Sequence, residues 1–155
     1  MLSCPACGRD ADIAHAWRCP CGHPLEFAKP LGPAPGTPPP DPASLDRDSG
    51  VWAFEAFLPD VPPEARVSLG EGWTPLVDVP GLVPAAAGDE LALAAKLEYV
   101  SPTGSFKDRG AAPTVAMAAD LGVERVLEDS SGNAGAAIAT YAARAGLPAR
   151  IYVPA

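Results

Sequence analysis

Apolar and small residues recur with a helical period in two segments of the second half of the chain. Residues 107–121 are rich in alanine, and Gly122 follows them as a stop signal. Residues 133–145 gather apolar side chains on one face, and Gly146 and Pro148 mark their end. The pattern predicts two helices. Pro113 falls inside the first one, where proline removes a hydrogen bond, and it indicates a helix that starts after Lys107.

Three shorter apolar segments alternate with these helices and are predicted to be strands. They cover residues 91–99, 125–128 and 149–153. Strands and helices that alternate in this order are typical of a parallel sheet. The sequence therefore predicts an α/β fold whose first strand leads into residues 101–107.

The first half of the chain divides by composition. Residues 30–42 contain seven prolines and two glycines, which favours an extended spacer over a packed core. We predict a cysteine-bearing segment at 1–27, a proline-rich linker at 28–50 and part of a larger domain at 51–155. Residues 51–58 fit either a short helix or an extended arm with aromatic anchors.

Charge narrows the classes of partner. The formal net charge of -8 argues against nucleic acid and against an anionic membrane surface. Residues 1–95 hold 5 basic and 13 acidic residues, whereas residues 96–155 hold 6 of each. No apolar run reaches the ~20 residues of a membrane helix, and residues 1–4 lack the character of a signal peptide. We expect a cytoplasmic protein, in which free thiols are stable.

Four cysteines form two short knuckles near the N-terminus. Cys4 and Cys7 are separated by two residues, Cys19 and Cys21 by one, and a glycine follows each pair. Four thiolates can close a tetrahedral zinc site, so the pattern predicts a structural zinc in a zinc-ribbon-like segment. The alternative is a set of free or oxidised thiols in a flexible tail. The same segment holds two weaker candidate ligands that we expect to be exposed, His15 and His23.

Two turns rich in small residues carry the candidate chemistry. One reads Ser101-Pro-Thr-Gly-Ser-Phe-Lys107-Asp-Arg-Gly110 and ends where the first helix begins. The other reads Ser130-Ser-Gly-Asn133-Ala-Gly135 and lies between a strand and a helix. Small residues let the backbone approach a ligand closely, and amides at a helix N-terminus bind carboxylates or phosphates. Each turn by itself also fits an ordinary helix start or cap.

Together, with Asn133 26 residues after Lys107, the two turns resemble the lysine and asparagine loops of the tryptophan-synthase-like (fold-type II) pyridoxal-phosphate enzymes. Within that family the resemblance is greatest to the threonine synthases, which share the cysteine segment and the segment Glu71-Gly-Trp-Thr-Pro-Leu76. This last segment fits a substrate contact or a proline turn that packs Trp73. The resemblance implies a three-layer parallel α/β sheet, of which this chain would hold the N-terminal half or less.

The resemblance also implies a pyridoxal-phosphate-dependent lyase that acts on an amino acid. Lys107 would form the Schiff base with the cofactor and then move protons between substrate carbons. Asn133 would hydrogen-bond the 3′-oxygen of the cofactor, and Ser131, Gly132, Asn133 and Ala134 would bind the substrate carboxylate. In threonine synthases the reaction converts O-phosphohomoserine and water to threonine and phosphate. Because the neutral amine is the nucleophile, we expect Lys107 to be partly desolvated.

Other assignments fit the same residues. Lyases of the threonine dehydratase and cysteate synthase types share both loops. The chain also fits a non-catalytic zinc-binding remnant, because the glycine-rich phosphate loop of the family would lie beyond Ala155. A full-length relative would be expected to pair as a homodimer. We expect Lys96 and Glu98 to form a solvated strand edge, and Asp108 and Arg109 to pair with each other or to cap nearby backbone.

Overall fold

The computed structural model describes residues 2–13, 16–28, 31–82 and 91–154. Its strands are β1 (Leu2–Ser3), β2 (Asp10–Ala11), β3 (Glu26–Phe27), β4 (Leu76–Asp78), β5 (Ala94–Lys96), β6 (Val126–Asp129) and β7 (Ala149–Tyr152). Its α-helices are α1 (Asp108–Asp120) and α2 (Asn133–Arg144). Its 3₁₀ helices are η1 (Pro42–Ser44), η2 (Arg47–Phe57), η3 (Pro63–Ala65), η4 (Pro80–Leu82) and η6 (Glu98–Val100).

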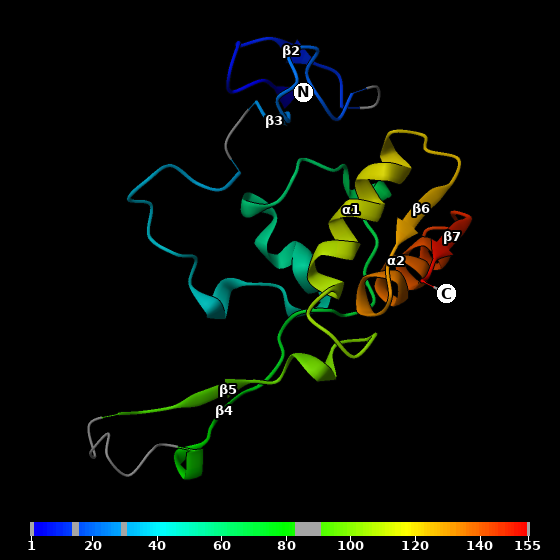
Figure 1. The fold of residues 1–155 in the computed structure, drawn as a ribbon. Helices are drawn as coiled ribbons and strands as arrows, with labels where there is room; N and C mark the ends of the chain where they lie inside the picture. Colours follow the sequence, from blue (N-terminus) through cyan, green and yellow to red (C-terminus); the bar gives the residue numbers. More distant parts are fainter. Residues whose placement is uncertain (1, 14–15, 29–30, 83–90, 155) are drawn as a thin grey trace.

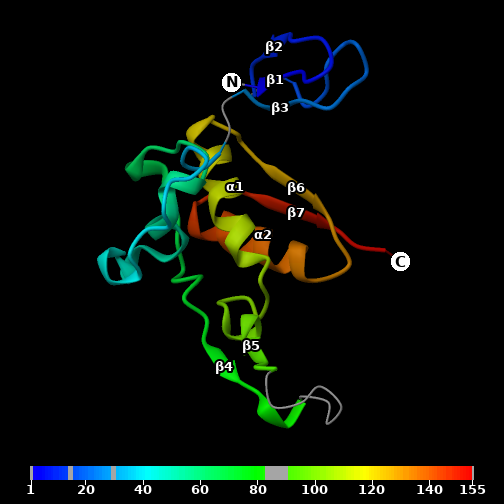
Figure 2. The same ribbon diagram turned by 90° about the vertical axis from the view of Figure 1, so that its left-hand side faces the viewer.

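Two helices stacked on a small parallel sheet form the centre of the molecule (Figures 1 and 2). Strand β6 pairs with β7 in parallel, with Val126 opposite Ala149 and Asp129 opposite Tyr152. Helix α2 packs on this sheet, and α1 packs on α2. The buried apolar cluster lies where the helices meet η2 and the chain that follows it, and it consists of Val51, Trp52, Val61, Val67, Ala111, Ala112, Val115, Ala116, Ala137 and Tyr141.

Both predicted helices are present with nearly the predicted bounds. Helix α1 begins at Asp108, one residue after Lys107, and continues through the buried Pro113. The packing of this small, apolar helix face outweighs the one hydrogen bond that proline removes. Both helices end in the predicted way, because the amides of Gly122 and Gly146 turn back to the carbonyls of Ala119 and Ala143.

The predicted first strand differs from expectation in length and in partner. It is reduced to β5, which pairs antiparallel with β4 and not with the parallel sheet. The two strands form an arm that extends away from the helices (Figure 1). In the described residues the parallel sheet therefore has two strands, and α2 covers one of its faces. The α/β architecture is present, whereas the three-layer arrangement expected from the resemblance is not complete.

The region between the cysteines and the arm has little regular structure. Most of residues 51–58 are helical, as part of η2, which resolves the choice between helix and extended arm. Trp52 is buried there, and its indole N–H donates to the carbonyl of Val67 at 2.8 Å. The cysteine segment is a separate small sheet in the order β2-β1-β3, with strands of two residues each.

Within the described residues, no helix has both the length and the apolar character needed to cross a membrane.

Candidate functional site

The lysine turn is held in place by the first residue of α1. Asp108 is fully buried, and its carboxylate accepts hydrogen bonds from the backbone N–H of Thr103, at 2.8 Å, and from the Thr103 hydroxyl. Lys107 immediately precedes the helix, and its carbonyl accepts from the amides of Gly110 and Ala111. Of the two alternatives for Asp108, capping of nearby backbone is therefore the observed one.

The neighbouring arginine ties the same turn to the base of the arm. Arg109 donates from Nε and Nη2 to the two carboxylate oxygens of Glu98, each at 2.9 Å. This fork-to-fork pair holds the pKa of Glu98 below its ordinary value, chiefly through the Arg109 hydrogen bonds. The expectation of a solvated edge at Glu98 is therefore wrong, because its side chain is turned towards α1. Lys96 donates to the carbonyl of Thr74.

The lysine side chain itself is more exposed than expected. Lys107 is an exposed residue, and its Nζ lies 4.9 Å from the centre of the Phe106 ring, which is itself 56% exposed. The expectation that Lys107 is partly desolvated is therefore not met. The contact with the ring is a cation–π interaction.

The asparagine turn presents an uncapped helix N-terminus. Gly132 precedes α2, and no side chain caps the helix. Its carbonyl accepts from the amide of Ala136, while its own N–H donates to the Ser130 hydroxyl at 3.2 Å. The first amides of a helix have no partner inside the helix, so those of residues 133–135 are available to an anion. Gly135 is buried against β7.

The two turns meet at one pocket of about 250 Å³. Its lining residues come from α1 and its start, from β6 and from α2, and they are Lys107, Gly110, Ala111, Thr114, Glu128, Ala134, Ala137 and Ile138. Of the predicted site residues the pocket includes Lys107 and Ala134. Ser131, Gly132 and Asn133 do not line it and lie on the exposed turn beside Ala134.

Glu128 and Thr114 were not predicted to belong to this pocket. On β6 the half-buried positions alternate with exposed ones, and Glu128 occupies a half-buried position that faces the helices. The alternation of the strand was therefore the signal that could have identified it. Thr114 lies two turns after Lys107 on α1, on the face that looks towards α2.

The lysine and asparagine turns have the space and the donors that a cofactor such as pyridoxal phosphate requires. A Cβ placed on Gly110 or on Gly132 would meet no atom within 4 Å, so the backbone at both turns is open to a ligand. The Ser101 hydroxyl, at the start of the lysine turn, is buried and has no hydrogen-bond partner among the described residues. The Lys107 amine and the free amides of α2 are thus available beside the pocket, while the unused Ser101 hydroxyl lies at the start of the lysine turn and does not line the pocket.

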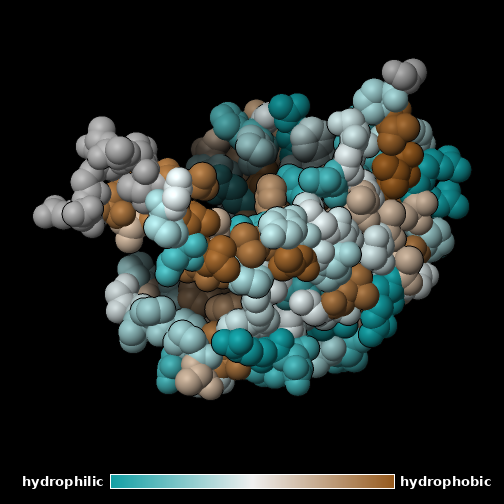
Figure 3. Space-filling model, turned by 90° about the horizontal axis from the view of Figure 1, so that it is seen from below, coloured by the Kyte–Doolittle hydropathy of each residue, from teal (hydrophilic) through white to brown (hydrophobic). Residues whose placement is uncertain are grey.

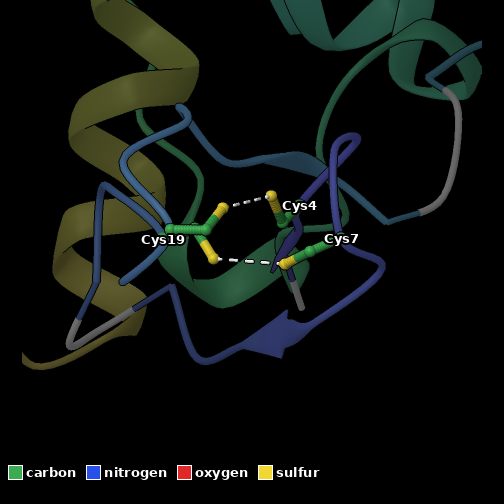
Figure 4. A group of neighbouring side chains, drawn as sticks. Cys4, Cys7 and Cys19 are labelled. Atoms are coloured by element: carbon green, nitrogen blue, oxygen red, sulfur yellow. Dashed lines mark hydrogen bonds between the residues drawn. The ribbon is translucent and has the colours of Figure 1, made fainter.

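The four cysteine sulfurs form a second candidate site, far from the lysine turn (Figures 1 and 4). All four Sγ atoms lie within 4.8 Å of one another, and the pairs Cys4–Cys21 and Cys7–Cys19 are 3.5 and 3.6 Å apart. These separations are too long for disulfides. They are close to the ~3.8 Å between sulfurs of a tetrahedral zinc site with Zn–S bonds of about 2.3 Å.

His23, one of the two weaker candidate ligands, lies beside Cys21. Nδ1 of His23 lies 3.7 Å from the sulfur of Cys21, while the four sulfurs lie within 4.8 Å of one another without it. A backbone hydrogen bond from His23, followed by side-chain contacts with Cys19 and His23, lowers the pKa of Cys21 to about 6. A thiolate is therefore favoured at this exposed position, as a metal ligand requires. His15 lies outside the described residues.

Exposed apolar side chains gather on the arm and at its base (Figure 3). On the arm, Leu76 and Leu82 are 68% and 70% exposed. At its base, Tyr99 is 69% exposed and lies in the chain between the arm and the lysine turn.

Comparisons with known proteins agree with this geometry. Residues 67–155 match the family model described as pyridoxal-phosphate dependent enzyme. The chain is 36% identical over 159 residues to a threonine synthase of Methanocaldococcus jannaschii, an alignment that covers 99% of this chain and 38% of the relative. It is 38% identical to a threonine synthase of Synechocystis over 67% of this chain and 27% of the relative. A threonine synthase of Methanosarcina acetivorans is 41% identical over 68% of this chain and 25% of that protein. The chain thus spans between a quarter and two fifths of the length of these relatives.

Proposed function

The chain belongs to the family of pyridoxal-phosphate dependent enzymes, and from that premise we propose that it carries the lysine and carboxylate-binding turns of a threonine-synthase-like lyase. The reaction would convert O-phosphohomoserine and water to threonine and phosphate. The observation that supports this most directly is the shared pocket, in which Lys107 and the first turn of α2 are brought together. The names of the relatives support the substrate.

In this proposal Lys107 is the residue that bonds the aldehyde of the cofactor. When bound, pyridoxal phosphate supplies an electron sink for the negative charge that develops on a substrate carbon. Once its amine is free, Lys107 Nζ donates and accepts the protons that move at the substrate carbons. The Lys107 side chain is exposed, so its amine is accessible to an incoming aldehyde.

The start of α2 is the proposed carboxylate site. The amides of Ser131, Gly132, Asn133 and Ala134 would face the substrate carboxylate, and the helix N-terminus favours its negative charge. The Asn133 side chain would hydrogen-bond the 3′-oxygen of the cofactor. The absence of a side-chain cap on α2 supports this role, because an external anion can take the place of the cap.

The chain contains only three lysines, which makes a sharp test of the lysine role practical. The protein is mixed with pyridoxal phosphate and reduced with borohydride, and adducts are mapped by mass spectrometry on Lys29, Lys96 and Lys107. Loss of water joins the amine to the aldehyde, and hydride from borohydride fixes the bond. We expect Lys107 to be modified at least about tenfold faster than the other two, since a preorganised site accelerates the reaction. Equal modification of all three lysines would refute the proposal.

A matched pair of variants separates the two turns. Lys107→Arg should abolish the adduct at residue 107, whereas Asn133→Ala should keep the lysine and slow its modification. The substrate is tested with the same protein by phosphate release from O-phosphohomoserine, compared with release from O-phosphoserine. Ammonia release from threonine would instead indicate a dehydratase.

We also propose that Cys4, Cys7, Cys19 and Cys21 bind a structural zinc. Four sulfurs with near-tetrahedral separations support it, and a site filled by four protein ligands leaves no open position for chemistry. Metal analysis of the purified protein should give one zinc per chain, which Cys4→Ser removes. A metal-free protein whose cysteine segment keeps its fold would contradict this part of the proposal.

A further inference from the structure

A buried carboxylate outside the pocket links segments that are far apart in the sequence. Glu71 is fully buried, and its two oxygens accept from the amides of Val51 and Leu69, at 3.1 and 2.9 Å, and from the Ser68 hydroxyl. Oε2 also accepts from the phenol of Tyr141, at 2.8 Å. Tyr141 lies on α2, 70 residues away in the sequence, and is fully buried as well. Burial, followed by this hydrogen bond, raises the pKa of Tyr141, so the phenol remains a donor.

Three residues further on, the same segment is attached to α1. The Thr74 hydroxyl is buried, donates to Glu98 Oε1 at 2.9 Å and accepts from Nη2 of Arg109 at 3.1 Å. Arg109 is the second residue of α1 and follows Lys107 by two positions. The segment Glu71–Thr74 is therefore bonded to α2 at one end and to the start of α1 at the other.

The direct contact between the helices needs such a link. The buried faces of α1 and α2 consist mainly of alanine, with Val115 and Tyr141 as the larger residues. Alanine side chains allow close approach, but they form shallow ridges and grooves, which restrict sliding and rotation less than large side chains do. Hydrogen bonds are directional, and a set of them that spans both helices can fix the relative position that the alanine contact leaves free.

We propose that Glu71–Thr74 acts as a strap that sets the position of the start of α1 relative to α2, and that Glu71 is its main positioning residue. The strap would thereby set the distance between Lys107 and the turn Ser131–Ala134. Neither Glu71 nor Thr74 lines the pocket, so their effect is transmitted through Arg109 and Tyr141. The chemical consequence rests on the proposed function, whereas the mechanical link does not.

The test compares Tyr141→Phe with Trp52→Phe by amide hydrogen exchange. Each variant removes one buried hydrogen bond of 2.8 Å, but only the Tyr141 bond connects α2 to the strap. In Tyr141→Phe we expect the amides of Thr103, Gly110 and Ala111 to exchange about tenfold faster than global stability alone would explain. In Trp52→Phe the exchange rates of these three amides should rise only as much as those of the slowest-exchanging core amides, which report the loss of global stability. Equal responses of the three amides in the two variants would overturn the strap.

A second variant tests the strap from its other end. Thr74→Val keeps the shape of the side chain and removes the hydroxyl that bonds Glu98 and Arg109. It should accelerate exchange of α2 amides around Tyr141, the reciprocal of the first effect, even if Tyr141→Phe does not fold. Unchanged exchange in α2 would count against the proposal as strongly as equal responses in the first experiment.

The cofactor experiment adds a readout for positioning. In Tyr141→Phe and Thr74→Val, borohydride-trapped pyridoxal phosphate on Lys107 should form about tenfold more slowly, while modification of Lys107 by formaldehyde should keep its rate. Formaldehyde needs only an accessible amine, so the ratio of the two rates reports the geometry of the site. If the wild-type chain gives no selective adduct on Lys107, the proposed function fails, and the exchange experiments still decide the strap.

Discussion

The cysteine segment and the body of the molecule, which runs from η2 to β7, are held together in different ways. Among the described residues of the cysteine segment, Leu2, Cys4 and Cys19 are buried, and its strands have two residues each. The body contains the whole buried cluster from Val51 to Tyr141, and a network of buried carboxylates and hydroxyls runs beside it. A unit as small as the cysteine segment cannot bury enough apolar surface to fold alone, so it depends on the cysteine sulfurs.

This difference predicts how each region responds to the loss of a single contact. In the cysteine segment, the four candidate metal ligands come from the two turns that connect its three strands. In the body, the loss of one contact is shared by neighbours, because Glu71 alone has four donors and the helices also pack directly on each other. We therefore expect all-or-none effects in the first region and graded effects in the second.

The largest effect is expected from removal of a cysteine. Structural zinc sites contribute about 10–16 kcal/mol of binding free energy, so Cys4→Ser should unfold residues 2–27 while α1 and α2 keep their protection. Amide hydrogen exchange of the two regions measures this directly. A chelator added to the wild type should give the same result, and His23→Ala, which leaves all four sulfurs, should change little. Loss of protection in both regions at once would show that the comparison between them is wrong.

Within the body, the largest single change is expected at Gly50. Its φ of 62° is costly for any residue with a Cβ, and an added Cβ would lie 2.4 Å from the Ser68 hydroxyl and 2.8 Å from Glu71 Oε1. Gly50→Ala should lower the free energy of unfolding by about 3 kcal/mol, from left-handed backbone and overpacking together. Gly36→Ala is the matched control, since its φ is 86° but nothing lies within 4 Å, and it should cost about 1 kcal/mol. Urea unfolding measures both, and equal losses would rule out the clash.

A smaller graded effect is expected where α2 meets the sheet. A Cβ on Gly135 would lie 2.8 Å from Cγ2 of Ile151 and 3.3 Å from the Ser130 Cβ. Gly135→Ala should destabilise the body by about 1–2 kcal/mol, because overpacking exceeds the gain in helix propensity. Gly110→Ala, also within a helix but with no neighbour inside 4 Å, should stabilise by up to about 1 kcal/mol. Changes of the same sign in thermal unfolding would contradict the packing of α2 on β7.

Local signals in the sequence predicted the parts of the body that depend on neighbouring residues. The alanine-rich period and the glycines at 122 and 146 located both helices, and the composition of residues 126–129 and 149–152 located the parallel pair. The cysteine spacing predicted a cluster that the structure brings together. The roles of Lys107 and Asn133, and the boundaries of the domains, remain predictions.

Contacts between distant residues had no such signal. Glu71 and Tyr141 are 70 positions apart, and Glu98 and Arg109 come from different elements, so nothing in either local pattern marks them as partners. The segment 91–99 looked like a strand of the parallel sheet, but its choice of partner depended on β4, an earlier segment that pairs with it as a hairpin. The exposure of Lys107 likewise depends on what surrounds the turn and not on the turn itself.

The smallest effect is expected from the Arg109–Glu98 pair, and it has a distinct pH dependence. The Arg109 hydrogen bonds hold the pKa of Glu98 below the ordinary 4.5, so its stabilising contribution is present above that pH and is lost as the pH falls through the lowered pKa. Glu98→Gln should therefore lower the free energy of unfolding of the body at pH 7, by about 1 kcal/mol or less because the pair is still partly exposed to solvent, and the two proteins should converge in acid. Glu55→Gln, which breaks the more exposed Arg66–Glu55 pair, is the control and should have little effect at any pH.

The measurement is the midpoint of urea unfolding at several pH values between 7 and 3. A chelator is present throughout, so that loss of metal from the cysteines on acidification does not contribute to the difference. A difference between wild type and Glu98→Gln that stays constant with pH would mean that the ionised carboxylate is not what stabilises the start of α1.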